Sequence, residues 1–298
     1  MPMKTAAYFA ENIRPPSLWS DRMSEKIKRR KIRLDDRIFR YMKFCSFEKM
    51  IHEQRINFKR PELWNDPYEN FFFRHKICIK NDSPIHLNPI SDKFYAVCWT
   101  ANAESEAFWR LYSRNGLCRT IRIESTVGDI LTAIHDAMPF DLQPAITDFC
   151  SAGKVVYRKP EVINKVLDRI YASLAEFDEK VLLRNKKGES WKNKLMRTLF
   201  EKRNAFKYEE EVRFVFDLFV KQTNEFPKFR FTQDKSEFSM PFDCRKYIKG
   251  ILVDPYATDE KVSEIKELVE TYGLNIKVEE SSMNRPHPSI VNQSKVTC

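Results

Sequence analysis

The chain has 298 residues, of which 42% are hydrophobic, and its formal net charge is +10. This hydrophobic content indicates a packed globular body and excludes a mostly disordered chain. No stretch reaches the roughly 18 to 20 uncharged apolar residues of a membrane helix, so we expect no membrane partner and a cytoplasmic location. The positive charge favours anionic partners. Glycine-rich phosphate loops of the GxxxxGK[ST] and GxGxxG types are absent.

The two ends of the chain differ in composition from its middle. Residues 1–35 are polar and basic and contain the breaker Pro15-Pro16, which indicates an N-terminal arm. Its densest cationic run, between Lys26 and Arg33, either contacts phosphates or forms a solvated face. We predict a single domain over residues 36–280 and a disordered tail over residues 281–298.

Hydrophobic periodicity predicts the elements of this domain in chain order. A strand is expected first, with Ser46 as the N-cap of the helix that follows, and Asn65-Asp66-Pro67 is expected to form a turn. The predicted strands lie at 37–44, 56–59, 93–100, 117–125, 153–159, 212–220, 228–233, 236–242, 246–255 and 274–280, and the main helices at 47–54, 105–114, 127–138, 162–183 and 259–273. The mostly helical stretch 127–200 is interpreted as an insertion carried on the sheet. The pattern predicts an α+β fold with mixed, mostly antiparallel sheets.

A group of charged residues precedes the central strand. Glu209, Glu211 and Arg213 alternate, so on a strand they share one face while Glu210 faces the other way. Such a set either holds a ribose hydroxyl or pairs with itself. Arg40 lies among aromatic residues, so it is expected to reach a cleft or to be exposed on the reverse face.

Other candidate residues are aromatic or amide side chains. Trp109 and Tyr112 are three residues apart and share a helix face, which is typical of a pocket wall or of a core. Asn65 either builds its turn or contacts substrate. The five histidines are isolated and show no ligand spacing, so we predict no metal site.

Several segments in this order resemble the bacterial domain-of-unknown-function family 2971. They are RIFRYMKF, INFKRPELWNDPYEN, YAVCWTANAESEAFWRLYSRNGLC, FKYEEEVRF and YIKGILVDP, which together cover roughly residues 37–255. The family name implies no activity.

The order of elements is also distantly similar to that of ADP-ribosyltransferases, in which two small sheets form a cleft for NAD. In those enzymes an Arg or His comes from an early strand and a Glu from a late one. The resemblance implies Glu211 or Glu209 as catalytic acid group, Arg40 toward the pyrophosphate, and Tyr41, Trp109 and Tyr112 as residues that line the pocket. From their own patterns described above, Asn65 and Arg213 are added as candidate cofactor-binding residues. It also implies NAD as substrate and, by analogy, a bacterial toxin or antiviral-defence effector.

Two other functions remain open. The first is a non-catalytic nucleic-acid-binding module that uses the basic arm and exposed aromatics. The second is a metal-dependent nuclease built on Asp66, Glu69, Glu209 and Glu211, since carboxylates can hold Mg²⁺. The acceptor, the oligomeric state and any regulatory partner are not indicated by the sequence.

Overall fold

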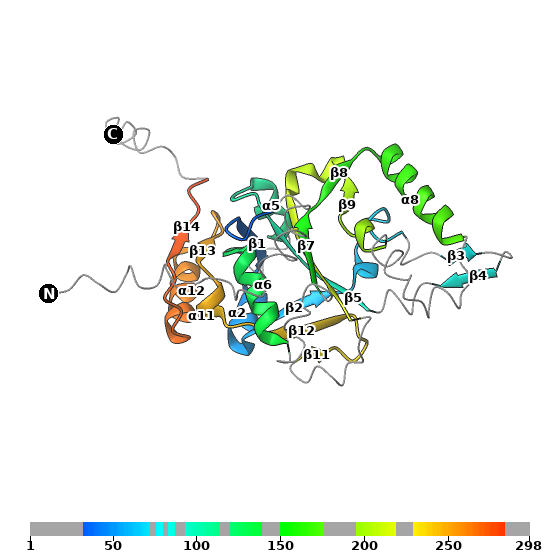
Figure 1. Ribbon diagram of the computed structural model, residues 1–298. Helices are drawn as coiled ribbons and strands as arrows, with labels where there is room; N and C mark the ends of the chain where they lie inside the picture. Colours follow the sequence, from blue (N-terminus) through cyan, green and yellow to red (C-terminus); the bar gives the residue numbers. More distant parts are fainter. Residues whose placement is uncertain are drawn as a thin grey trace, which may run out of the picture.

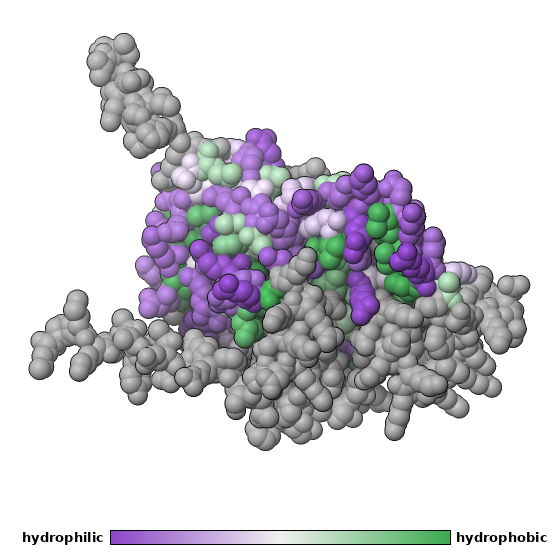
Figure 2. Space-filling view, turned by 45° about the horizontal axis from the view of Figure 1, so that its top comes forward, coloured by the Kyte–Doolittle hydropathy of each residue, from purple (hydrophilic) through white to green (hydrophobic). Residues whose placement is uncertain are grey.

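The computed structural model describes residues 32–71, 76–79, 83–86, 93–113, 120–138, 150–175, 195–218 and 229–283. The predicted arm up to residue 31 and the predicted tail beyond residue 283 lie outside these residues. No helix within the described residues is both long and apolar enough to cross a bilayer. Figure 2 shows a face on which the described surface is mostly hydrophilic, with small apolar patches.

The main feature of the fold is a ten-stranded sheet in which all pairs are antiparallel except that of β13 with β14. The path of the sheet runs β11-β12-β2-β5-β1-β6-β13-β14, and β10 joins β5 to β7. Its strands are β1 (Arg37–Lys43), β2 (Arg55–Lys59), β5 (Phe94–Thr100), β6 (Thr120–Thr126), β7 (Cys150–Lys154), β10 (Glu211–Asp217), β11 (Arg230–Phe231), β12 (Glu237–Pro241), β13 (Gly250–Val253) and β14 (Val278–Glu280). The predicted mixed α+β fold with a mostly antiparallel sheet is confirmed.

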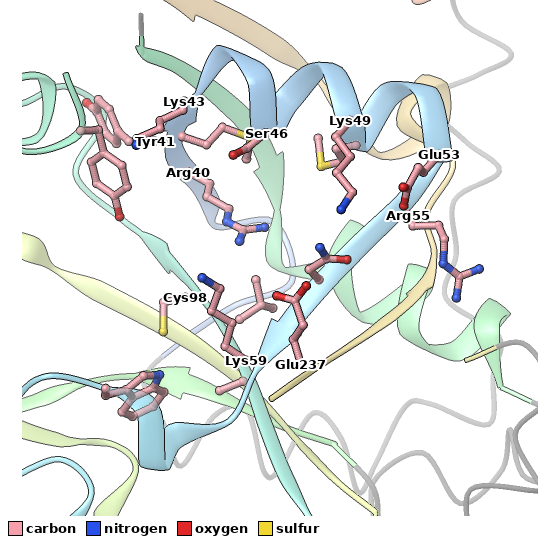
Figure 3. A pocket seen from close by; sticks show the side chains of 17 residues that line it. Arg40, Tyr41, Lys43, Ser46, Lys49, Glu53, Arg55, Lys59, Cys98 and Glu237 are labelled. Carbon is pink, nitrogen blue, oxygen red and sulfur yellow. The ribbon is translucent and has the colours of Figure 1, made fainter. Parts of the chain in front are cut away.

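The two edges of β5 are used differently. One edge pairs with β10 along the whole strand, from Glu211 opposite Thr100 to Asp217 opposite Phe94. The other edge is shared, because β1 is registered with it only at Thr100 and β2 only at Ala96. Helix α2 (Phe44–Glu53) connects β1 directly to β2. The sheet therefore splits beside the middle of β5, and β1, α2 and β2 surround the opening (Figure 3).

A large apolar core covers one face of the sheet. It combines the buried sides of α2, α6 (Val127–Ala137) and α12 (Asp259–Thr271) with Phe214 and Phe216 of β10. The short helix α11 (Cys244–Tyr247) adds to it. Thr126 and Thr258 cap α6 and α12 by accepting backbone hydrogen bonds, which supplies partners for amides that a helix start leaves unpaired.

A second, smaller core lies on the other face, where Val215 of β10 meets helix α8 (Pro160–Ala175). The β3–β4 pair (Lys76–Ile79 and Ser83–His86) lies near α8 at one end of the molecule, and α11 and α12 lie at the other end (Figure 1). The remaining elements are η2 (Pro61–Leu63), α5 (Glu106–Tyr112), η5 (Asn204–Glu209) and the parallel pair of β8 (Val156–Arg158) with β9 (Glu201–Arg203). Apolar cores on both faces explain why every residue of β10 is buried.

Some predicted boundaries differ from the structure. Helix α2 begins at Phe44 rather than after Ser46, because Phe44 itself packs into the core, and no side chain caps this helix. The predicted strand at 153–159 is divided between β7 and β8. The stretch 127–200, predicted as an insertion, supplies α6 to the main core and β7 to the main sheet.

Candidate functional site

Two adjoining pockets open beside the split in the sheet. The larger has a volume of about 540 Å³ and lies between β1, α2, β2 and β5. The smaller, of about 180 Å³, lies between β1, β5, α5 and the start of β10. Both are lined by Arg40, Tyr41, Cys98 and Tyr112, so they meet at these four side chains.

Arg40 occupies the boundary between the pockets. It follows Phe39, the residue at which β1 is paired with β5, so it lies where the two strands part. Its side chain is half-buried, and it forms no hydrogen bond or ion pair with the residues that the structure describes. Burial lowers the pKa of its guanidinium below the ordinary value. An arginine that is partly desolvated and lacks a carboxylate partner is a ready site for an anion.

The larger pocket is strongly cationic. Its lining includes Arg40, Lys43, Lys49, Arg55 and Lys59 but only two carboxylates, Glu53 and Glu237. Figure 3 shows Arg40, Lys49, Lys59 and Glu237 around the same open space. Among the described residues, the three lysines are exposed and have no acid partner, whereas Arg55 donates hydrogen bonds to Ser239. The pocket therefore presents free positive charge.

Glu211 lines the smaller pocket and is 8% exposed. Burial alone would raise the pKa of this carboxyl group. The Arg213 guanidinium at 2.6 Å and the Lys202 ammonium at 3.4 Å outweigh that effect and lower the pKa to about 2. Glu211 is thus an ionised carboxylate in a largely water-excluded site.

Glu209 and Glu210, the other two glutamates of the run, have different surroundings because the backbone turns at Glu210. Glu209 ends η5 and lines the smaller pocket, where its carboxylate lies 2.5 Å from the Lys202 ammonium. Burial raises the pKa of Glu209, although Lys202 opposes this. Glu210 adopts the left-handed conformation (φ 42°) and is exposed. Because β10 begins only at Glu211, Glu209 meets Glu211 through Lys202 and not, as predicted, as a neighbour on one strand face.

Arg213 does not line either described pocket. It is 1% exposed, and its guanidinium carbon lies 4.2 Å from the centroid of the Trp64 ring. It donates hydrogen bonds to Glu211, to Glu69 and to the Leu199 carbonyl. Arg213, expected either to contact the cofactor or to pair within its charged set, thus pairs with Glu211 and supports it. Glu69 comes from the NDPYE turn and also contacts Lys202 at 3.3 Å. The turn therefore supplies a carboxylate that holds both buried cations.

The aromatic candidates separate into buried and exposed positions. Tyr41 stacks on Phe108, with ring centroids 4.9 Å apart, and meets the edge of Trp109 at 4.8 Å. Trp109, expected in a pocket wall or in a core, is fully buried in the core and donates its indole N–H to Glu104. Tyr112 is 38% exposed and lines both pockets. Of the two helix aromatics, only Tyr112 can touch a ligand in these pockets.

Asn65 is exposed and lines neither pocket, while its neighbour Asp66 accepts a hydrogen bond from the Tyr68 amide and pairs with Arg203. The chain does not show a metal-binding group of three or more His, Cys, Asp or Glu within its described part. The carboxylates of the nuclease hypothesis that lie in the buried network, those of Glu69, Glu209 and Glu211, are paired with Lys202 or Arg213.

Sequence reasoning missed Lys49, Lys59, Cys98 and Glu237. A signal for Lys59 was present, because β2 reads RINFK, with polar residues alternating with the buried Ile56 and Phe58. Arg55, Asn57 and Lys59 all face the larger pocket. Nothing comparable marks Glu237, which arrives from β12 by long-range pairing.

The fold and site together define a mixed α+β protein with a cationic pocket joined to a carboxylate pocket. Residues 108–214 match the family described as "Protein of unknown function (DUF2971)", which confirms the predicted resemblance over this region. A comparison with curated proteins finds no match.

Two solved structures are similar to the chain. One is Thermus sp. 2.9 DarT in complex with NAD+, with 9% identity, coverage of 83% of this chain and 96% of that chain, and a TM-score of 0.34. The other is the same protein in complex with ADP-ribosylated ssDNA, with 11% identity, coverage of 83% and 93%, and a TM-score of 0.32. Likenesses of this strength define neither the fold nor the function of this chain.

Proposed function

We propose that the chain binds NAD and breaks its nicotinamide–ribose bond, as an ADP-ribosyltransferase or an NAD glycohydrolase. The observation that carries this proposal is the position of Arg40. It stands without an acid partner among the described residues, at the junction between a cationic pocket and a pocket that is lined by the ionised Glu211. The sequence resemblance to ADP-ribosyltransferases adds the expectation that this junction forms their cleft.

The charges of NAD match this arrangement. The pyrophosphate is anionic and accepts paired hydrogen bonds from a guanidinium, so it is assigned to Arg40. The nicotinamide ribose then extends into the smaller pocket toward Glu211, and Tyr112 offers a ring face to the nicotinamide. The adenosine end extends into the larger pocket.

The chemistry calls for an ionised carboxylate and not for a general acid. When the bond between C1′ and the nicotinamide nitrogen breaks, the bonding electron pair goes to the nitrogen and the nicotinamide leaves as a neutral molecule. Positive charge develops on the ribose, and a carboxylate fixed beside it stabilises that transition state. Glu211 is suited to this role because its low pKa keeps it charged at neutral pH.

The second half of the reaction requires a nucleophile and a base. Water or an acceptor group attacks C1′, and its proton must be taken up nearby. Glu209 lines the same pocket and has a raised pKa, so we assign it to this role. A toxin or antiviral-defence role rests on the sequence resemblance alone, and a nucleic-acid partner would use the basic arm outside the described residues.

The test is release of nicotinamide from NAD by the purified protein, measured by chromatography. Wild type is expected to release nicotinamide. Glu211→Gln is expected to release it at least about 100-fold more slowly, the usual effect of removing one group that stabilises transition-state charge. Glu210→Gln is the matched control, because it makes the same change at the exposed neighbouring residue. Equal rates in the two variants would refute the assignment of Glu211, provided that both fold.

A further inference from the structure

The larger pocket carries more positive charge than the pyrophosphate of NAD needs. Arg40 alone can form a bidentate contact with a phosphate. Lys43, Lys49 and Lys59 line the same pocket, and none of them pairs with an acid in the described part of the chain. After the two carboxylates of the lining, Glu53 and Glu237, and the pyrophosphate are counted, positive charge remains for a further anionic group of the ligand.

The surplus charge belongs to the pocket wall itself. Lys49 projects from the face of α2 that also carries Ser46 and Met50, and Lys59 comes from the polar side of β2. Figure 3 shows the amines of Lys49 and Lys59 on either side of the Arg40 guanidinium. Three cations from three consecutive elements therefore surround one space. Like charges that line one pocket repel one another, and an anion between them removes that repulsion.

The rest of the lining fits an adenosine. Met42, Met50 and Trp64 offer apolar surface for a base, and Glu237 offers an acceptor for a ribose hydroxyl or an amino group. An unmodified adenosine is neutral, however, and leaves Lys49 and Lys59 without a partner. A phosphate monoester on its ribose carries about −1.5 to −2 charge near neutral pH and several acceptor oxygens, which suits two ammonium groups.

We propose that the preferred substrate is a dinucleotide with an additional phosphate on its adenosine ribose, NADP⁺, and that Lys49 and Lys59 recognise this phosphate. The proposal rests on the proposed function, because the rest of the dinucleotide is placed by Arg40 and Glu211. It adds the substrate class, which nothing in the Arg40–Glu211 junction determines.

The experiment is calorimetric titration of the full chain with NADP⁺ and with NAD⁺. Wild type is expected to bind NADP⁺ at least about tenfold more tightly, since hydrogen bonds to charged groups contribute at least this factor. The double variant Lys49→Ala/Lys59→Ala should bind the two dinucleotides with affinities within about threefold of each other. Lys165→Ala, at an exposed lysine on α8 that lines neither pocket, should keep the wild-type preference.

Each outcome separates the two proposals. Equal affinities in wild type would overturn the assignment of the phosphate and leave the proposed function standing. A preference that falls equally in the double variant and in Lys165→Ala would also overturn it, because the general positive field of the protein would then be responsible. Absence of binding by both dinucleotides at millimolar concentration would overturn both proposals. Both lysines are exposed, so the double variant is expected to fold normally.

Discussion

Replacing Arg213 by methionine should destabilise the protein strongly, and should do so in a pH-dependent way. Arg213 is 1% exposed and contacts the carboxylates of Glu69 and Glu211. Methionine has a similar length but no charge, so the variant leaves these two buried carboxylates and that of Glu209 with Lys202 as their nearest cation.

The magnitude follows from this burial. Breaking a buried ion pair by removing one partner costs about 3–5 kcal/mol, because the remaining charge stays in a medium that solvates it poorly. Arg110→Met is the matched control, since Arg110 pairs with Glu106 at a similar distance, 2.7 Å, but its side chain is 72% exposed. An exposed pair of this kind contributes only about 0–1 kcal/mol.

Urea-induced unfolding at pH 7 and at pH 5 measures both parts of the prediction. Without Arg213, we expect burial to outweigh the remaining effect of Lys202 and to raise the pKa of Glu211 above its unfolded value, so the variant should gain stability as the pH falls toward 5. Wild type should show no such gain from Glu211. A loss in Arg213→Met as small as that in Arg110→Met, with no dependence on pH, would refute the account of the buried network.

Three further predictions concern stability. In wild type, the pKa of Glu211 is lowered from 4.5 to about 2, so its stabilisation of the fold, roughly 3 kcal/mol, is present above about pH 5 and is lost as the pH falls toward 2. Glu211→Gln should reduce this loss of stability in acid titrations, and an unchanged profile would contradict the prediction. Trp109→Ala should lower the free energy of unfolding in urea by about 3–5 kcal/mol because the side chain is fully buried. Leu111→Ala, at a residue that is 45% exposed, should lower it by about 0.5 kcal/mol or less, and similar values for the two would place Trp109 outside the core. Thr258→Ala should cost about 1 kcal/mol, seen as a lower melting temperature, because it removes the N-cap of α12; an unchanged melting temperature would show that this cap does not contribute.

Much of the fold could be predicted because short, local sequence patterns specify its strands and helices. The alternation at 37–44, the apolar run at 93–100 and the helical spacing at 259–273 correspond to β1, β5 and α12. The split in the sheet could not be predicted in the same way. It depends on which residues of β5 pair with β1 and with β2, and these are long-range contacts that no local pattern specifies.

In the candidate site too, local sequence patterns do not specify the long-range contacts. Arg40, Tyr112, Glu209 and Glu211 do line adjoining pockets, although they come from distant parts of the chain. Pairing of Arg213 with Glu211 is one of the two alternatives that the sequence leaves open, whereas its second partner, Glu69, lies 144 residues away in sequence and could not be foreseen. Helical spacing places Trp109 and Tyr112 on one helix face. It could not show that Tyr41 and Glu104 contact Trp109.

The most direct test of the central claim is a calorimetric titration of NAD into wild type, Arg40→Ala and Arg169→Ala. Arg169 is an exposed arginine of α8 that lines neither pocket, so its removal should leave the affinity unchanged. We predict saturable binding to wild type that weakens at least about tenfold in Arg40→Ala, the loss expected for a charge-assisted contact to phosphate. Absence of binding to wild type at millimolar NAD, or equal affinity in Arg40→Ala, would contradict the claim that Arg40 holds the pyrophosphate of a dinucleotide.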